Sequence, residues 1–340
     1  MSNRIFYASQ GVAVGGSGGT TTVQGAQSVT MNTNYNLEQV FQLGRLEVYD
    51  NVVGDPSVEV GITKVLDGSP LIYTLACGSG SIQQTANVES AVTFAVGADT
   101  VENIGDNASS AVTSISCSPI YVQSLTYTFP VDGDFTEEVN FVGINKTVGS
   151  GTVASPSGGS DTTQTVLRRQ NFKIAGLPLA VASGNVQSVT ISADLGRESI
   201  YKLGQFKEFH RYVNFPLEIS LEVEVLATEL DEFEINVDNL GCSGLNLDKE
   251  SVTIELCSPT DGGTVYSFDL GDKVSLTSVA FNGGDTGGGN ATLTYSYIAY
   301  NTFTPAGPGS EALSAQAFVE SQSVDVRPPA DADADADLDW

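Results

Sequence analysis

Apart from its carboxylates, this chain of 340 residues has few side chains that could do chemistry. Asp and Glu total 41, and some stand close together, as Asp132 does to Asp134 and Glu137 to Glu138. Two such carboxyl groups can act as general acid and base, as in glycoside hydrolysis. With so many acids, however, neighbouring pairs arise without selection, and a solvated acidic face is sufficient to explain them.

The one histidine, His210, stands beside Arg211 in the aromatic-rich segment FKEFHRYVNFP. A catalytic histidine needs an acid or a nucleophile held nearby, so we interpret His210 as a packing residue or a subunit contact. The sequence has no GxSxG, HExxH or P-loop motif, and no dinucleotide-binding motif in a strand-turn-helix context. We therefore expect no enzyme activity and no cofactor.

The cysteines are too few and too far apart for a disulfide scaffold or a zinc site. They are Cys77, Cys117, Cys242 and Cys257, and none form a CxxC pair. We expect buried free thiols. The C-terminal PPADADADADLDW lacks the glycine turn and the closing glutamate of a calcium loop, so no metal site is predicted.

The balance of charge narrows the function further. Lys and Arg total 14 against 41 acids, which gives a formal charge of −27. Such a surface repels phosphate, which argues against nucleic-acid binding through basic patches but does not prevent DNA from passing along it. No segment approaches about 18 uninterrupted apolar residues, and the N-terminus lacks a signal-peptide pattern. We expect neither a membrane span nor export by a cleaved signal.

An internal repeat organises the chain. Residues 27–46 (QSVTMNTNYNLEQVFQLGRL) and 187–206 (QSVTISADLGRESIYKLGQF) align without a gap at an offset of 160, and Pro56 and Pro216 keep that offset. Because each copy of a repeat of this kind should be one folded unit, we predict two equivalent domains in one chain.

Composition sets the boundaries of these domains. The Gly/Ser/Thr-rich stretch 148–163 is predicted to be a linker between a first domain at 25–147 and a second at 164–327. Residues 1–24 are interpreted as an N-terminal arm that can pair with a neighbouring subunit. Residues 328–340 are expected to form a disordered acidic tail.

The fold class predicted from composition and periodicity is mainly β, with two tandem β-sandwich domains. Strict alternation over 58–62 and 217–225 predicts strands with one buried and one wet face. The acids on the wet face are Glu59, Glu218, Glu222 and Glu224.

Further elements follow from local patterns. Asn34 and Asp194 each precede apolar residues at helical spacing and a glycine, which predicts a short flanking α-helix in each domain. Residues 71–75 are predicted to be a strand. Later strand pairs look alike at an offset of 154, which matches Tyr127 with Phe281, Val139 with Leu293 and Phe141 with Tyr295; the stretch TDGGTVYSFDLGDK is expected to add a hairpin.

The patterns SVTMNTNYNLEQVFQLG, KVLDGSPLIYTLA and SADLGRESIYKLG resemble virion structural proteins of tailed bacteriophages, in particular the tail tube protein of long-tailed phages. The resemblance spans most of residues 25–300. It implies β-sandwich domains with a flanking helix, six of which form a ring whose inner strands join into one β-barrel around a channel. Two domains in one chain then imply a homotrimeric ring with pseudo-sixfold symmetry.

The resemblance also implies a location and partners. The location is the virion tail, assembled in the host cytoplasm. The partners are further copies of the chain, stacked as rings into a tube, and tail proteins such as sheath, baseplate or terminator. DNA is a partner only in transit, without specific nucleic-acid binding, and no membrane is involved.

Two sets of residues become candidates for roles in such a tube. Glu59, Glu218, Glu222 and Glu224 are candidates for the channel wall, with an outward, solvent-facing position as the alternative. The scarce cations near the second repeat are candidate inter-subunit contacts, since they can hold acidic neighbours together. They are Arg168, Arg169, Arg197, Lys202, Lys207 and Arg211.

Two other kinds of function stay open on the sequence alone. One is a different phage assembly part, such as a capsid decoration protein, a tail terminator or a baseplate ring. The other is a carbohydrate-binding or carbohydrate-hydrolysing β-sandwich. The single tryptophan, Trp340, lies in the tail and gives little support for an aromatic sugar platform.

Overall fold

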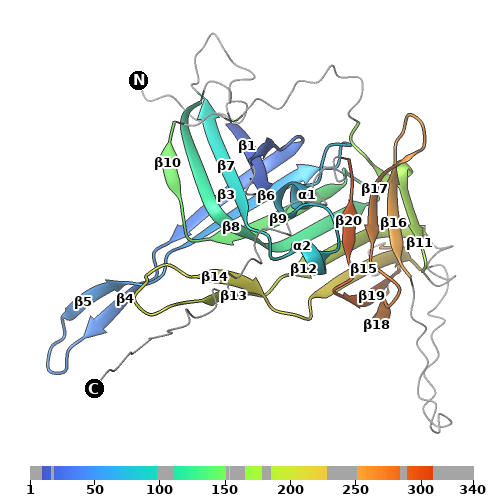
Figure 1. Cartoon of the computed structure of the whole chain (residues 1–340). Coiled ribbons are helices and arrows are strands. Elements are labelled where there is room, and N and C mark those ends of the chain that lie inside the picture. The colour runs from blue at the N-terminus through green and yellow to red at the C-terminus, as the bar shows by residue number, and fades with distance from the viewer. Residues whose placement is uncertain are drawn as a thin grey trace, which may run out of the picture.

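The structure, a computed structural model, describes residues 10–16, 19–97, 111–150, 153, 165–177, 185–227, 251–283 and 289–308. Within these residues the fold is mainly β, as predicted, with two short α-helices (Figure 1). The acidic tail and Cys242 lie outside the described residues, and so does most of the predicted linker.

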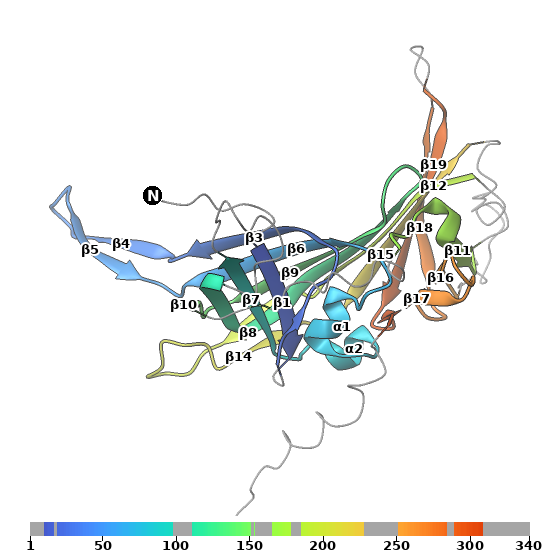
Figure 2. The ribbon, with the colours of Figure 1, turned by 90° about the horizontal axis from the view of Figure 1, so that it is seen from above.

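One continuous antiparallel sheet, here called the main sheet, crosses both predicted domains. Its strands lie in the order β3-β6-β9-β8-β12-β15-β19-β18 (Figures 1 and 2). Their bounds are β3 Ala26–Asn34, β6 Ser57–Val65, β9 Thr136–Gly143, β8 Ala111–Pro130, β12 Asn185–Asp194, β15 Glu218–Leu226, β19 Thr292–Tyr300 and β18 Ser275–Asn282. We call the first four strands with their connecting segments the first unit, and the last four with theirs the second unit. The pairing of β8 with β12 joins the two units edge to edge.

Rows of paired residues cross the two units in the same way. Each row begins on the first strand of its unit, at positions that the sequence repeat matches, and ends on the fourth. The rows are Val29–Ile62–Val139–Leu125 and Val189–Val223–Tyr295–Val279. All members are buried except Val29 and Val279, which lie on the two outermost strands. The alternation predicted for β6 and β15 is therefore confirmed, since one face of each strand packs on the core.

The rows also correct one alignment made from sequence. They match β8 with β18 at the predicted offset of 154, so Tyr127 corresponds to Phe281. They match Val139 with Tyr295, however, so β9 and β19 differ by 156 and the predicted match to Leu293 is wrong. Both units contain a β-bulge at the equivalent place on the fourth strand, between Val122 and Ser124 and between Leu276 and Ser278. Both also contain one on the first strand, between Ala26 and Ser28 and between Val186 and Ser188.

Other strands cover the apolar face of the main sheet. In the first unit the cover includes β1 (Gln10–Gly16), β7 (Ser90–Gly97) and the N-terminal part of β8, with the short β2 (Thr21–Thr22) and β10 (Thr147–Gly149) paired at its margins. The predicted N-terminal arm thus contributes β1 to the sheet of its own chain.

A separate four-stranded sheet forms the rest of the cover. Its order is β11 (Phe172–Ala175), β16 (Thr253–Cys257), β17 (Thr264–Asp269) and β20 (Thr304–Ala306). Phe268 on β17 packs on Tyr127 and Phe129 of β8, with ring centroids 4.6 and 5.4 Å apart. β16 and β17 form the hairpin expected around TDGGTVYSFDLGDK. The two layers give the sandwich-like character that the sequence predicted.

The helices predicted after Asn34 and Asp194 are wrong, because both segments form β-hairpins. We call them the first arm, β4 (Leu37–Phe41) with β5 (Val48–Val53), and the second arm, β13 (Arg197–Ile200) with β14 (His210–Val213). The expected helix caps make turns instead: the side-chain carboxylate or amide oxygen of Asp194 and Asn34 accepts the N–H two residues on.

The expected helix stops are hairpin turns. Gly44 and Gly204 have φ values of 85° and 84°, which glycine adopts without steric cost. Figures 1 and 2 both show the two arms leaving the body on the same side. Apolar residues spaced for a helix face also fit β-branched and aromatic strands, and the glycine at the turn decides between them.

The strand predicted over residues 71–75 is also wrong. Residues Ile72–Cys77 form helix α1, followed by α2 (Ile82–Thr85). A short apolar run cannot be assigned from periodicity alone. A buried carboxylate from β9, described below, accepts the first N–H groups of α1 and favours the helix.

Candidate assembly surface

The outward face of the main sheet carries small polar side chains and carboxylates. Hydroxyl and amide residues occupy it on strand after strand, for example Ser124, Thr126 and Thr128 on β8 and Thr190 and Ser192 on β12. Lys64 is the one Lys or Arg in these eight strands, and its side chain is buried on the opposite face. The described outward face is therefore hydrated, without cations.

The four predicted wall residues all stand on this face. Glu59 lies on β6, and Glu218, Glu222 and Glu224 lie on β15; Glu224 is half-buried and the others are exposed. Because β6 and β15 occupy the same place in the two units, the structure brings the four carboxylates onto one sheet face.

Hydrogen bonds tie the polar face together across neighbouring strands. Ser192 Oγ and Ser220 Oγ are 2.7 Å apart, and Ser188 Oγ donates to Glu224 Oε2 at 3.1 Å. Asn140 Nδ2 in the first unit donates to Ser124 Oγ at 3.2 Å. Such bonds occupy much of the hydrogen-bonding capacity of the hydroxyls and stiffen the surface.

Two strand edges of the main sheet are open in the described part of the chain. β3 pairs only with β6, and β18 pairs only with β19. An unpaired edge presents free backbone N–H and C=O groups to another strand. Phe281 on β18 points to the apolar face of the main sheet. Its side chain is nevertheless 50% exposed.

The two arms carry most of the exposed apolar surface. Of the 20 large hydrophobic residues that are exposed in the described chain, ten lie in residues 35–53 and seven in residues 200–215. Leu43 and Leu203 at the two tips are fully exposed. Large exposed apolar patches are typical of interaction sites, so the two arms are candidates for one.

The predicted inter-subunit cations fall into three groups. Arg168 and Arg169 form exposed ion pairs with Asp134 and Asp132, at 2.7 and 3.6 Å, so these acids are solvated as predicted. On the second arm, Lys202 Nζ lies 3.3 Å from the ring centroid of Phe209. Lys207 is exposed on the same arm.

Of the last two cations, Arg197 holds the second arm to the first unit, and Arg211 forms an ion pair within that arm. The Arg197 guanidinium donates to the carbonyl oxygens of Val122, at 2.8 Å, and Ala86, at 2.5 Å, and burial lowers its pKa to about 10. Arg211 is buried and donates to Glu208 through Nε and Nη2, at 3.0 and 2.9 Å. These bonds lie within one chain, at the joint between the units.

His210 packs at the same joint, as its aromatic neighbourhood suggested. Its Nδ1 lies 3.6 Å from Glu89 Oε1 and 3.4 Å from the Tyr121 hydroxyl, which donates to that carboxylate at 2.8 Å. The ring stacks edge-on against Tyr212. Asn87 Oδ1 accepts the N–H of Val213 nearby. His210 thus belongs to the contact between the second arm and the first unit.

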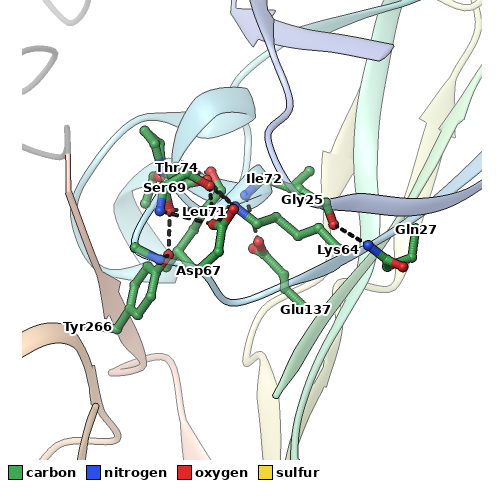
Figure 3. Close-up of polar contacts among 12 residues, drawn as sticks. Gly25, Gln27, Lys64, Asp67, Ser69, Leu71, Ile72, Thr74, Glu137 and Tyr266 are labelled. Atoms are coloured by element: carbon green, nitrogen blue, oxygen red, sulfur yellow. Dashed lines mark hydrogen bonds and ion pairs between the residues drawn. The ribbon is translucent and has the colours of Figure 1, made fainter. Parts of the chain in front are cut away.

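The cluster that most resembles an enzyme site is internal. Lys64 and Glu137 are cross-strand partners on β6 and β9, and both are fully buried (Figure 3). Sequence reasoning placed Glu137 on a solvated face, which is wrong for this residue. Lys64 Nζ donates to Ser69 Oγ at 2.7 Å and to the Pro70 carbonyl at 2.8 Å, and lies 3.8 Å from Asp67 Oδ1.

Glu137 acts as the cap of helix α1. Its carboxylate accepts the N–H groups of Ile72 and Tyr73, at 2.7 and 3.1 Å, and the Tyr127 hydroxyl at 3.1 Å. Desolvation raises the pKa of Glu137 and lowers that of Lys64. Glu137 is engaged with the backbone of α1 and with Tyr127, and Lys64 with the Asp67–Pro70 turn, so this cluster holds the helix and the turn in place. A lysine and a glutamate in register on paired strands are the sequence signal for it, visible once the pairing is known.

Comparisons with known proteins, and the remaining side-chain clusters of the described residues, indicate no other site. The sequence matches no protein-family model, and no curated protein is similar to it at a significant level. Within the described ranges, no cluster of His, Cys, Asp and Glu could hold a metal ion. None of the described helices is long and apolar enough to span a bilayer. Cys77, Cys117 and Cys257 are free and buried, as expected.

Proposed function

We propose that this protein is a non-enzymatic structural protein whose copies close into a ring through their sheet edges, and whose rings stack into a tube that conducts DNA, as in a phage tail. The carrying observation is the β8–β12 seam, where two units of the same strand order pair edge to edge within one chain. We interpret the two units as an internal duplication, supported by the shared rows and bulges.

The open edges supply the same kind of joint between chains. β18 occupies in the second unit the place that β8 has in the first, and β3 occupies the place of β12. A head-to-tail contact of this type generates a ring when its rotation closes. Closure also removes the open edges, which otherwise invite aggregation.

The stagger of the main sheet fits a closed barrel. The row that begins at Val29 reaches Leu125, which pairs across the seam with Ala193, the repeat equivalent of Thr33. Thus the row shifts by four residues for every four strands. About 3.3 Å along the strand for about 4.8 Å across it gives a tilt of roughly 35°, as in known barrels.

Three chains would give the ring suggested by the resemblance. Eight main-sheet strands per chain make 24 in a trimer, and a barrel with that strand number and tilt has a backbone diameter of about 45 Å. That width admits duplex DNA. The polar face would then be the wall, with carboxylates that repel phosphate so that DNA slides without binding.

Electron microscopy of the purified chain, with its mass measured by light scattering, tests the proposal. Stacked rings or tubes are the expected result. Single rings that never stack would favour a terminator or baseplate ring. A monomer at all concentrations, with its arms exposed, would overturn the proposal.

A further inference from the structure

We propose that the seam inside the chain is the template for the seam between chains, so that the contacts between two copies can be assigned residue by residue. This inference rests on the proposed function and deepens it. The partner is a second copy of the chain, and two contacts define its position: a strand register and an arm contact.

The register is fixed by the internal seam. There, Tyr127 on β8 lies opposite Ile191 on β12, and both are fully buried. Thr126 lies opposite Ser192 on the polar face. Both pairs lie in regular stretches, away from the bulges of β8 and β12.

The residue matches between the two units allow the same register to be applied to the open edges, β18 of one copy and β3 of the next. Tyr127 and Ile191 correspond to Phe281 and Met31, so Phe281 of one copy lies opposite Met31 of the next. Thr126 and Ser192 correspond to Ala280 and Asn32. The half-exposed Phe281 ring is then covered, as its counterpart Tyr127 is covered within the chain.

The arm contact follows from the same equivalence. At the internal seam, desolvation and the nearby Asp55 carboxylate raise the pKa of Tyr201, which places the second arm beside the base of the first arm. The repeat matches Tyr201 with Phe41 and Asp55 with Phe215. Phe41 of one copy therefore packs on Phe215 of the next, and these rings are 61% and 47% exposed in the isolated chain.

The net charges of the two arms support a second copy of the chain as the partner. Residues 35–55 around the first arm have one cation and four acids, a net charge of −3, and residues 195–215 around the second arm have four cations and two acids, a net charge of +2 with His210 neutral. In a ring, the arms of opposite charge alternate. Each apolar arm then lies between two arms that attract it.

Disulfide trapping tests the register. In a Cys242→Ser background, N32C/A280C places two cysteines directly opposite each other across the predicted seam, where Cβ atoms lie about 4.5–5.5 Å apart and need only a small approach to form a disulfide. Mild oxidation should then convert most of the protein into covalent oligomers on non-reducing gels. The matched control S28C/A280C is four residues out of register and should form at least tenfold less.

The outcomes separate the inference from the proposed function. If rings are seen in the microscope but the control variant also crosslinks, or neither variant does, the template is overturned. Ring formation itself would then still stand. A wild-type chain that never assembles would instead overturn the function itself.

A charge swap tests the arm contact. F41E and F215K should each raise the concentration needed for assembly at least tenfold, because each places a charge against an apolar ring, and the double variant should recover most of the loss. Val148→Glu, a control at an exposed apolar residue outside the arms, should have little effect. No recovery in the double variant would contradict a direct contact.

Discussion

The two arms come from matched stretches of sequence and have the same hairpin shape, yet only the second is fixed to the body of its own chain. Arg197 at the root of the second arm donates to two carbonyl oxygens of the first unit, and Val213 is buried there. The matched position in the first arm is Leu37, which is 63% exposed. The difference teaches that matched sequences can be used differently: the second arm docks on its own chain, whereas the equivalent residue of the first arm stays exposed to solvent.

The interiors of the two units differ in a second way. Lys64 and Glu137 face each other in the first unit, and the equivalent cross-strand pair in the second unit is Val225 and Leu293, both buried. The ionic pair accompanies helix α1, whose N–H groups need an acceptor. The described part of the second unit contains no α-helix to cap, and apolar residues occupy the equivalent pair.

The largest effect on stability is expected for a substitution that breaks the Lys64–Glu137 pair of the first unit. Glu137→Leu should lower the free energy of unfolding by about 3–5 kcal/mol, because it leaves Asp67, 3.8 Å away, as the remaining carboxylate beside the buried Lys64 and leaves two N–H groups without an acceptor. Chemical denaturation measures the change.

The double variant K64V/E137L copies the second unit and is the matched control. It should recover part of that stability, since it removes the buried ammonium group of Lys64 together with the carboxylate of Glu137. A single variant as stable as wild type would mean that the ionic pair does not hold α1 in place.

A smaller effect should distinguish the two arms. Arg197→Ala should cost about 2–3 kcal/mol, because it removes charged hydrogen bonds to buried carbonyl groups. Leu37→Ala at the matched position should change the stability of the monomer by less than about 0.5 kcal/mol. Equal losses in thermal unfolding of monomeric protein would show that the first arm is also anchored within the chain.

The polar face should tolerate change in folding but not in function. Glu222→Lys should alter the free energy of unfolding by less than about 0.5 kcal/mol. In assembled tubes it should increase retention of duplex DNA at low salt, because cations in the wall attract phosphate. Asp272→Lys, on the exposed loop after β17, is the control. Equal DNA retention in both variants would place Glu222 outside a channel.

The smallest expected signal concerns the thiols. Burial raises the pKa of Cys77 to about 12, so at pH 8 almost none is thiolate in the folded protein. Iodoacetamide should leave Cys77 unmodified until denaturant is added, as mass spectrometry can follow. Rapid labelling of the native protein would mean that the first unit opens locally.

Much of this architecture is visible in the sequence, but the longer-range contacts are not. Alternation predicts β6 and β15 because one face of each is buried, and the repeat predicts two units of one kind. Assignment from apolar periodicity fails for the arms, because their exposed apolar residues on a hairpin have the spacing of a helix face. Lys64 was missed because its partner Glu137 lies 73 residues away and meets it only through strand pairing.

The joint between β8 and β12 has a consequence for how the protein can change over time. In a ring of six identical polypeptides, every substitution is repeated six times, and neighbouring arms must carry the same charge. With both units on one chain, a mutation in one leaves the other untouched. The opposite charges of the two arms and the single ionic core are differences that identical subunits could not show.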